Sequence, residues 1–124
     1  MLRKQCTRSV QNLVLGRHII AEAEISDKSF LNDDKKLLEA ITTASRKAGM
    51  TVISGASHKF SPQGATAIVL LAESHVSIHT WPEYNYAAID VYTCGKNPEH
   101  VMEELRCLLP IKKLKVMFVD RGPK

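Results

Sequence analysis

The sequence predicts an α+β fold, a two-layer sandwich in which a mostly antiparallel sheet carries two helices on one face. Two segments place apolar residues at helical spacing, and the segments around them are short and rich in β-forming residues. The 124 residues, 44% of them hydrophobic, supply enough apolar material for one core. We therefore expect residues 1–124 to form a single domain.

Both predicted helices are bounded by residues typical of helix ends. In the first, the polar run 32–34 precedes the apolar repeat and Gly49 follows it. In the second, Asn97 and Pro98 form a typical cap and first turn, and Pro110 ends the repeat.

The remaining apolar segments predict strands, because they alternate in polarity or form short β-rich runs. They are residues 13–23, 50–53, 66–71, 75–81, 87–92 and 111–119. Glycine, serine and proline in residues 55–64 predict a long loop, and residues 82–86 a turn. Because two helices cover only one face of such a sheet, the other face would be bare in a monomer, and we expect a dimer.

The charge of the chain is mild and does not indicate a nucleic-acid partner. Lys and Arg total 17 and Asp and Glu 13, a net charge of +4, with the basic residues mainly near the two ends. Charges at chain ends are typical of solvated termini, and no zinc-finger or helix-turn-helix pattern accompanies them. The mostly apolar run 64–72 is far shorter than the roughly 20 residues that span a bilayer. With no apolar secretory segment in residues 1–12, we expect a cytoplasmic protein without a membrane partner.

The unusual chemistry of the chain is concentrated in residues 73–95. This segment gathers hydroxyl, imidazole, carboxylate, indole and thiol groups, which ordinary strands dilute with valine and isoleucine. One of the three cysteines, Cys94, lies in it, and the odd number argues against a disulfide framework. For Cys107, within the second helix, we expect a small buried side chain, and Cys6 lies in a polar tail.

Three chemistries compete for this segment. In the first, Ser74 or Cys94 is a hydrolase nucleophile and His79 is its base. This is disfavoured, because Ser74 lacks the flanking glycines of a nucleophile elbow. A zinc site using His75 and His79 is disfavoured, because same-face residues four apart in a strand lie roughly 13 Å from each other. The third is serinolysis: Ser74 attacks the carbonyl of Glu73, elimination cleaves the chain, and a pyruvoyl group remains at Ser74. An imidazole such as His79 is a suitable base for that step.

The segment resembles a known family, the pyruvoyl-dependent S-adenosylmethionine decarboxylase proenzymes of the small prokaryotic type. The resemblance is carried by Glu73-Ser74-His75, by His79-Thr80-Trp81-Pro82-Glu83-Tyr84 and by Tyr92-Thr93-Cys94-Gly95. Similarity extends upstream to Gly16-Arg17-His18 and His58-Lys59-Phe60 and covers roughly residues 13–119.

The resemblance implies autocatalytic cleavage at Glu73-Ser74 into a β chain 1–73 and an α chain 74–124. The pyruvoyl group made from Ser74 would form a Schiff base with the substrate amine and accept electrons as carbon dioxide leaves. The product would donate aminopropyl groups for spermidine biosynthesis. Family members are homodimers of processed protomers with active sites at the interface, and no metal is implied.

The resemblance also assigns roles to single residues. Ser74 would be the pyruvoyl precursor, His79 the proton acceptor in processing, and Cys94 the proton donor in decarboxylation. The implied substrate-binding residues are Phe60 from the partner protomer, Trp81 and Glu83. Aromatic faces attract the substrate's sulfonium, and a carboxylate accepts from its hydroxyls. The chain departs from the family at two places: Thr66 stands near the position of a second serine that often assists processing, and Asn85 replaces a glycine.

Two other functions compete with this interpretation. The same scaffold decarboxylates arginine or ornithine in some relatives, but Phe60 and Glu83 favour an adenosyl substrate, because a small amino acid offers nothing to stack. A non-enzymatic binding or regulatory homologue would have no chemical reason to keep Ser74, His79 and Cys94 together.

Overall fold

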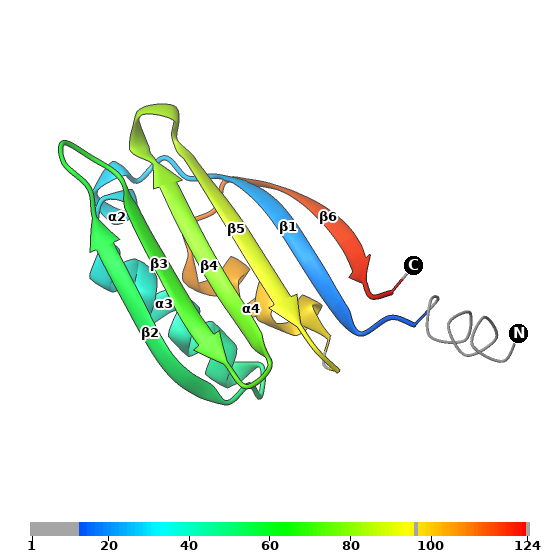
Figure 1. The fold of residues 1–124 in the computed structure, drawn as a ribbon. Helices are drawn as coiled ribbons and strands as arrows, with labels where there is room; N and C mark the ends of the chain where they lie inside the picture. Colours follow the sequence, from blue (N-terminus) through cyan, green and yellow to red (C-terminus); the bar gives the residue numbers. More distant parts are fainter. Residues whose placement is uncertain (1–12, 96, 124) are drawn as a thin grey trace, which may run out of the picture.

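The chain folds into one six-stranded sheet with its helices on a single side (Figure 1). The computed structural model describes residues 13–95 and 97–123. Its elements are β1 (Gly16–Glu24), α2 (Lys28–Leu31), α3 (Asp34–Lys47), β2 (Val52–Lys59), β3 (Ala65–Leu71), β4 (Ser74–Trp81), the 3-10 helix η1 (Pro82–Tyr84), β5 (Tyr86–Thr93), α4 (Pro98–Leu108) and β6 (Lys113–Arg121). Cys6, residues 1–12 as a whole and Lys124 lie outside the described residues.

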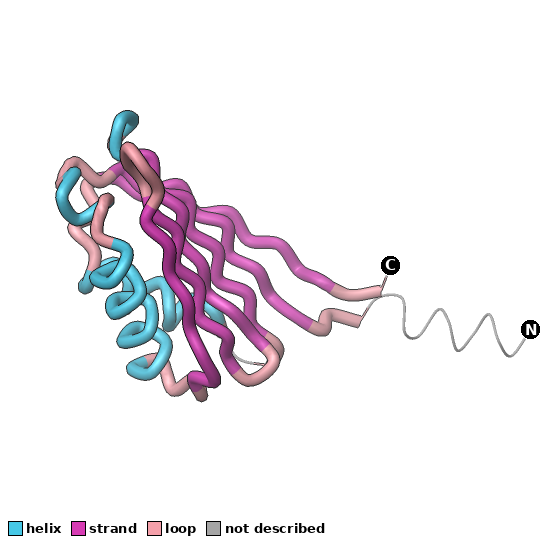
Figure 2. Tube along the Cα trace, turned by 60° about the vertical axis from the view of Figure 1, so that its left-hand side comes forward, coloured by secondary structure: helices cyan, strands magenta, loops and turns pink. Residues whose placement is uncertain are grey.

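The sheet is antiparallel throughout, in the order β2-β3-β4-β5-β1-β6. Side chains alternate along β4: Val76 and Ile78 are fully buried, whereas His75 and His79 are partly exposed. The buried set faces α3 and α4, which lie together on one side of the sheet (Figure 2). No described helix covers the other side, which we call the open face. The predicted α+β sandwich is confirmed.

Both long helices begin at the predicted caps. The Asp33 carboxylate accepts from the Lys36 N–H at 3.1 Å, and the Asn97 side chain accepts from the Glu99 N–H at 2.9 Å. Gly49, just after α3, has a φ of 85°, a left-handed conformation that ends helices at little cost to glycine. None of the described helices is long and apolar enough to cross a membrane.

Two predictions about local structure were wrong, and one short helix was missed. Residues 55–59 belong to β2, so the predicted loop shrinks to residues 60–64. Serine and glycine are poor strand formers by themselves, and the ladder with β3 overrides them at this sheet edge. Helix α2, four residues long, is too short to produce a periodic signal. Cys107 is exposed rather than buried, because it lies off the apolar stripe of α4.

The core between sheet and helices holds the strands that carry the chemistry in a fixed register. Ile19 of β1, Ile78 of β4, Ile41 of α3 and Leu105 of α4 are each fully buried there. Interiors this densely packed resist sliding of one strand past another. The open-face side chains of β4 and β5 therefore keep the relative positions described below.

Candidate active site

The bond predicted to be cleaved lies in the tight turn between β3 and β4. β3 ends at Leu71 and β4 begins at Ser74, so Ala72 and Glu73 form the whole turn. Glu73 has a φ of 62°. A left-handed conformation costs a residue other than glycine about 1–2 kcal/mol. Backbone strain is thus located at the residue whose carbonyl carbon Ser74 would attack.

Ser74 and Cys94 lie side by side, although they are distant in sequence. β4 and β5 are antiparallel with His75 opposite Tyr92, so the start of β4 meets the end of β5. The Cys94 N–H donates to Ser74 Oγ at 3.2 Å, and Ser74 is only 7% exposed. Three predicted residues, Glu73, Ser74 and Cys94, therefore meet at one end of β4. We call them the serine half of the site.

His79 lies toward the opposite end of the same strand. Five residues of extended strand span roughly 17 Å, so within one chain the His79 ring does not reach Ser74. Its Nδ1 lies 2.9 Å from the hydroxyl oxygen of Thr66, the residue directly opposite on β3. This hydrogen bond fixes the orientation of the imidazole ring.

A cavity of about 390 Å³ lies at the His79 end of the sheet. Its lining includes His79 and all three predicted substrate-binding residues, Phe60, Trp81 and Glu83. Phe60 is 48% exposed and Trp81 is 40% exposed, so neither ring is buried in the core. The volume suits a small molecule. We call Phe60, His79, Trp81 and Glu83 the aromatic half of the site.

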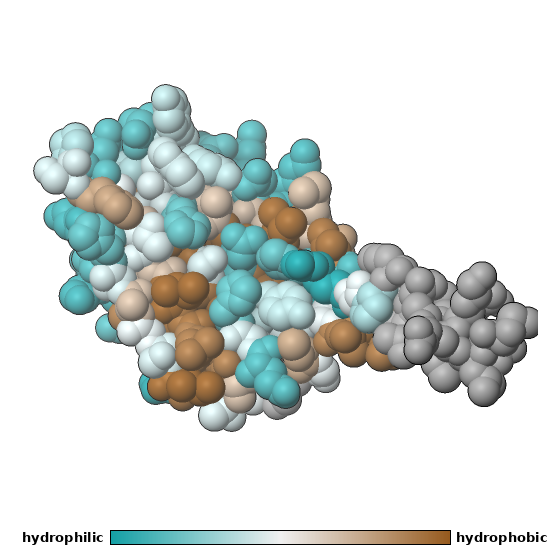
Figure 3. Space-filling view, viewed as in Figure 1, coloured by the Kyte–Doolittle hydropathy of each residue, from teal (hydrophilic) through white to brown (hydrophobic). Residues whose placement is uncertain are grey.

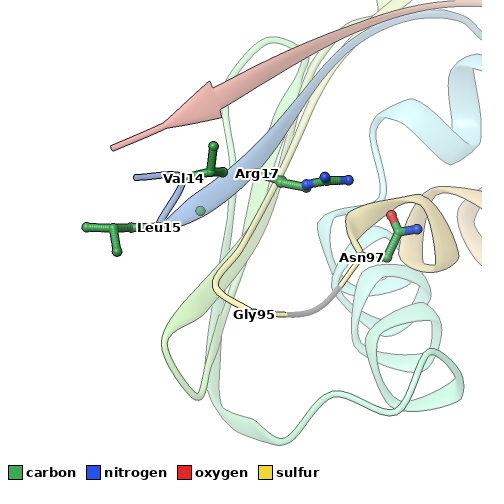
Figure 4. Close-up of a pocket in the computed structure, with 6 residues that line it drawn as sticks. Val14, Leu15, Arg17, Gly95 and Asn97 are labelled. Carbon is green, nitrogen blue, oxygen red and sulfur yellow. The ribbon is translucent and has the colours of Figure 1, made fainter. Parts of the chain in front are cut away.

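A second cavity, of about 380 Å³, opens beside the serine half (Figure 4). It is lined by Val14, Leu15, Gly16, Arg17, Gly95 and Asn97. Figure 4 shows the Arg17 side chain extending from β1 toward the start of α4. Gly95 directly follows Cys94, so Arg17 places a cation near the serine half. Sequence reasoning assigned no role to Arg17, because its proximity to Gly95 depends on the pairing of β1 with β5.

Tyr92 is a further residue at the serine half to which the sequence assigned no role. A hydrogen bond with the Cys94 side chain, followed by burial, raises the pKa of Tyr92 above its ordinary value, and the Arg121 guanidinium opposes this. The phenol therefore remains protonated at neutral pH. The Tyr-x-Cys spacing was the available signal, since residues two apart in a strand share a face.

The two histidines of β4 have partners other than a metal. His75 stacks on Tyr92 with ring centroids 5.6 Å apart, and His79 bonds Thr66. Among residues 13–95 and 97–123, no three His, Cys, Asp or Glu side chains are grouped so as to hold a metal ion.

Asn85 follows η1 at the position where the family resemblance led us to expect glycine. Its φ is 52°, the left-handed conformation that asparagine tolerates better than most residues. Lys28 Nζ donates to Asn85 Oδ1 at 3.1 Å and to the Pro82 carbonyl at 2.9 Å. These bonds tie α2 to the turn that carries Glu83.

Comparison with known proteins identifies the family. The family model for S-adenosylmethionine decarboxylase matches residues 17–122. An S-adenosylmethionine decarboxylase proenzyme of Synechococcus sp. (strain WH7803) is 49% identical over 104 residues, covering 84% of this chain and 79% of the relative. One from Methanococcus vannielii is 46% identical over 110 residues, covering 87% and 90%. The crystal structure of adenosylmethionine decarboxylase from Aquifex aeolicus superposes with a TM-score of 0.81 at 37% identity, covering 88% of this chain and 92% of that one. The chain belongs to the S-adenosylmethionine decarboxylase family.

Proposed function

We propose that the chain is a proenzyme that cleaves itself at Glu73-Ser74 and then decarboxylates S-adenosylmethionine, using a pyruvoyl group made from Ser74. The products of cleavage would be chains 1–73 and 74–124. The observation that carries the proposal is the serine half, where a left-handed Glu73 precedes a buried Ser74 that touches Cys94.

The cleavage step uses groups that the turn brings together. Ser74 Oγ bonds to the carbonyl carbon of Glu73 as the peptide C–N bond breaks, which converts the amide to an ester. A base then removes the α-proton of Ser74, and Glu73 leaves as a free carboxylate. Water replaces the remaining amine, which departs as ammonia, and a keto group stays at Ser74. The left-handed backbone at Glu73 favours the first of these steps, because opening the turn releases its strain.

The residues around Ser74 suit a pyruvoyl group. The group would occupy the place of the Ser74 side chain, within reach of the Cys94 N–H. When bound to substrate, such a group supplies an electron sink for the pair that carbon dioxide leaves behind. The Cys94 thiol would donate the proton that the substrate's α-carbon then needs.

The aromatic half suits the adenosyl part of the substrate. The exposed faces of Phe60 and Trp81 offer stacking area for a purine and attraction for a sulfonium. The Glu83 carboxylate lies in the same cavity and can accept hydrogen bonds from ribose hydroxyls. Arginine and ornithine have no counterpart to these groups.

The separation of the two halves supports a homodimer with shared sites. They lie at opposite ends of β4, about 17 Å apart by strand rise. A two-fold axis through the open face near Ser77 would set the serine half of one protomer against the aromatic half of the other. Large apolar side chains are exposed among the outer strands, including Ile68, Leu70 and Met117, which are 43%, 50% and 49% exposed. Figure 3 looks onto this face and shows apolar surface over β2 and β3 and again toward β6.

Intact mass under denaturing conditions tests the cleavage. We expect two chains that meet at Glu73-Ser74, the second bearing a keto group in place of its amine, and one uncut chain in S74A. Ser77→Ala, a nearby serine of β4 that is also 7% exposed, is the matched control and should still be cut. Carbon dioxide release from S-adenosylmethionine then tests the substrate. An uncut wild-type chain, or release from arginine or ornithine alone, would overturn the proposal.

Mixing variants tests whether His79 acts across the interface. His79→Ala retains Ser74, and Ser74→Ala retains His79. If the partner's His79 serves each Ser74, co-expression of the two variants should restore cleavage of the His79→Ala chain, which alone stays uncut. A His79→Ala chain that remains uncut in the mixed dimer would refute the shared site, while one cut equally well alone would remove His79 from processing.

A further inference from the structure

The core does not fix either aromatic ring of the aromatic half. Phe60 directly follows the edge strand β2, and Trp81 is the last residue of β4. Both rings are partly exposed, Phe60 beside the His58 ring and Trp81 beside the Tyr86 ring. Apolar packing of this kind leaves a ring at the end of a strand free to shift. The polar contacts of the backbone next to each ring therefore decide where the ring lies.

Asn32, at the end of α2, holds the loop that carries Phe60. Its Oδ1 accepts from the Gly64 N–H at 2.8 Å. The Gly64 carbonyl in turn accepts from the Phe60 N–H at 2.8 Å. The other end of the Asn32 amide, Nδ2, donates to the Lys28 carbonyl at 3.1 Å. Both ends of the amide are thus used, and they join the loop of residues 60–64 to α2.

Lys28, at the start of α2, holds the wall that carries Trp81 and Glu83. Its Nζ donates to the Pro82 carbonyl at 2.9 Å, and Pro82 lies between these two residues in the chain. Figure 1 shows α2 at the end of the sheet where β2 and β4 finish, next to the segments that follow both strands. One short helix is therefore bonded to both walls of the cavity.

We propose that α2 sets the spacing between the two walls of the aromatic half, and with it the fit to an adenosyl group. Asn32 is the positioning residue for Phe60, and Lys28 is the positioning residue for the wall that begins at Trp81. The inference rests on the proposed function, in which this half holds the adenosyl part of the substrate. Dispersion attraction between stacked rings falls steeply once a gap opens, so a small shift of either wall weakens binding.

Binding of adenosine to the purified protein tests this proposal separately from turnover. Trp81 is the one tryptophan of the chain and lines the cavity, so its fluorescence reports binding there. Asn32→Ala removes the acceptor for the Gly64 N–H, and we expect adenosine to bind about fivefold more weakly. Asn32→Asp keeps an acceptor oxygen at that place and should bind adenosine nearly as tightly as wild type does.

A variant of Lys28 tests the other wall. Lys28→Met removes the donor to the Pro82 carbonyl and keeps an unbranched side chain, and we again expect adenosine binding about fivefold weaker. Lys35→Met is the matched control, because it removes the same charge from a side chain that is 80% exposed and lies 4.0 Å from Asp34. It should bind adenosine as wild type does. In the active enzyme, Asn32→Ala and Lys28→Met should raise KM and leave kcat nearly unchanged, because neither residue belongs to the serine half.

A double variant separates positioning of Phe60 from a general loosening of the fold. If Asn32 acts through Phe60, Asn32→Ala should have little further effect on adenosine binding once Phe60→Ala has removed the ring. A loss as large as the one seen with Phe60 in place would refute the role of Asn32, since Asn32 would then act on the fold as a whole.

Failure of this proposal is distinguishable from failure of the proposed function. If wild-type protein releases no carbon dioxide from S-adenosylmethionine, the proposed function fails, whatever the adenosine titrations show. If wild-type protein is active but Asn32→Ala and Lys28→Met match Lys35→Met in both adenosine binding and KM, the role of α2 is refuted.

Discussion

The hydroxyl of Thr80 joins three segments next to the aromatic half, and its removal should be costly. Thr80 Oγ1 accepts from the Ala65 N–H at 2.9 Å and donates to the Leu31 carbonyl at 2.7 Å. The side chain is 6% exposed, so water cannot replace either bond. Thr80→Val keeps the shape of the side chain and leaves both backbone groups without this partner.

The expected loss follows from these two bonds. A buried polar group left unsatisfied costs about 1–3 kcal/mol. Because a carbonyl oxygen left short of one bond is better tolerated than an N–H, we expect Thr80→Val to lower the free energy of unfolding by about 2–4 kcal/mol. The end of α2 and the start of β3 would loosen first, since Leu31 and Ala65 lie there.

Urea unfolding in the uncut Ser74→Ala background measures this loss. All variants are compared at one protein concentration, because dimerisation would make stability depend on concentration. Thr42→Val is the matched control: the Thr42 hydroxyl donates to the Leu38 carbonyl at 2.6 Å within α3, where that carbonyl also has its helical partner. The control should change stability by under about 0.5 kcal/mol. A Thr80→Val variant no less stable than the control would refute the reasoning.

Three further predictions concern groups outside the proposed machinery. The hydrogen bond from Tyr86 to Glu22 raises the pKa of Tyr86 to about 12, so Glu22→Gln should return it toward its ordinary value of about 10 in a tyrosinate absorbance titration; an unchanged titration would contradict this cause. At the left-handed Asn85, alanine should be less stable than glycine by about 1 kcal/mol in urea, and equal stability would show that the turn relaxes. The Ser57 hydroxyl donates to the Asp34 carboxylate and lowers the pKa of that group. The bond therefore stabilises the fold at pH values above the ordinary pKa of aspartate, and this stabilisation is lost as the pH falls through the lowered pKa of Asp34. Ser57→Ala should therefore melt earlier than wild type at neutral pH, with the gap closing in acid; a gap that is constant with pH would argue against the link.

Local signals predicted the two long helices and most strands, because those elements are set by near neighbours. The cap at Asp33 and the left-handed stop at Gly49 depend on residues within a few positions. The same reasoning failed for residues 55–59, where Ser and Gly form a strand only because β3 supplies a partner. Burial of Cys107 was also mispredicted, because helical spacing alone left its side of α4 undecided.

The sequence by itself determined the family, the fold class and the chemically unusual segment, because residue types and their spacing are local properties. The tertiary structure alone decided which of those residues meet. Antiparallel pairing of β4 with β5 brings Cys94 to Ser74, whereas the extended geometry of β4 carries His79 away from Ser74. The strand register also placed the Tyr92 ring over Gly16, a relation that the long separation of these two residues along the chain does not reveal. Contacts between strands depend on register, and register is fixed by the packing of the whole sheet on α3 and α4.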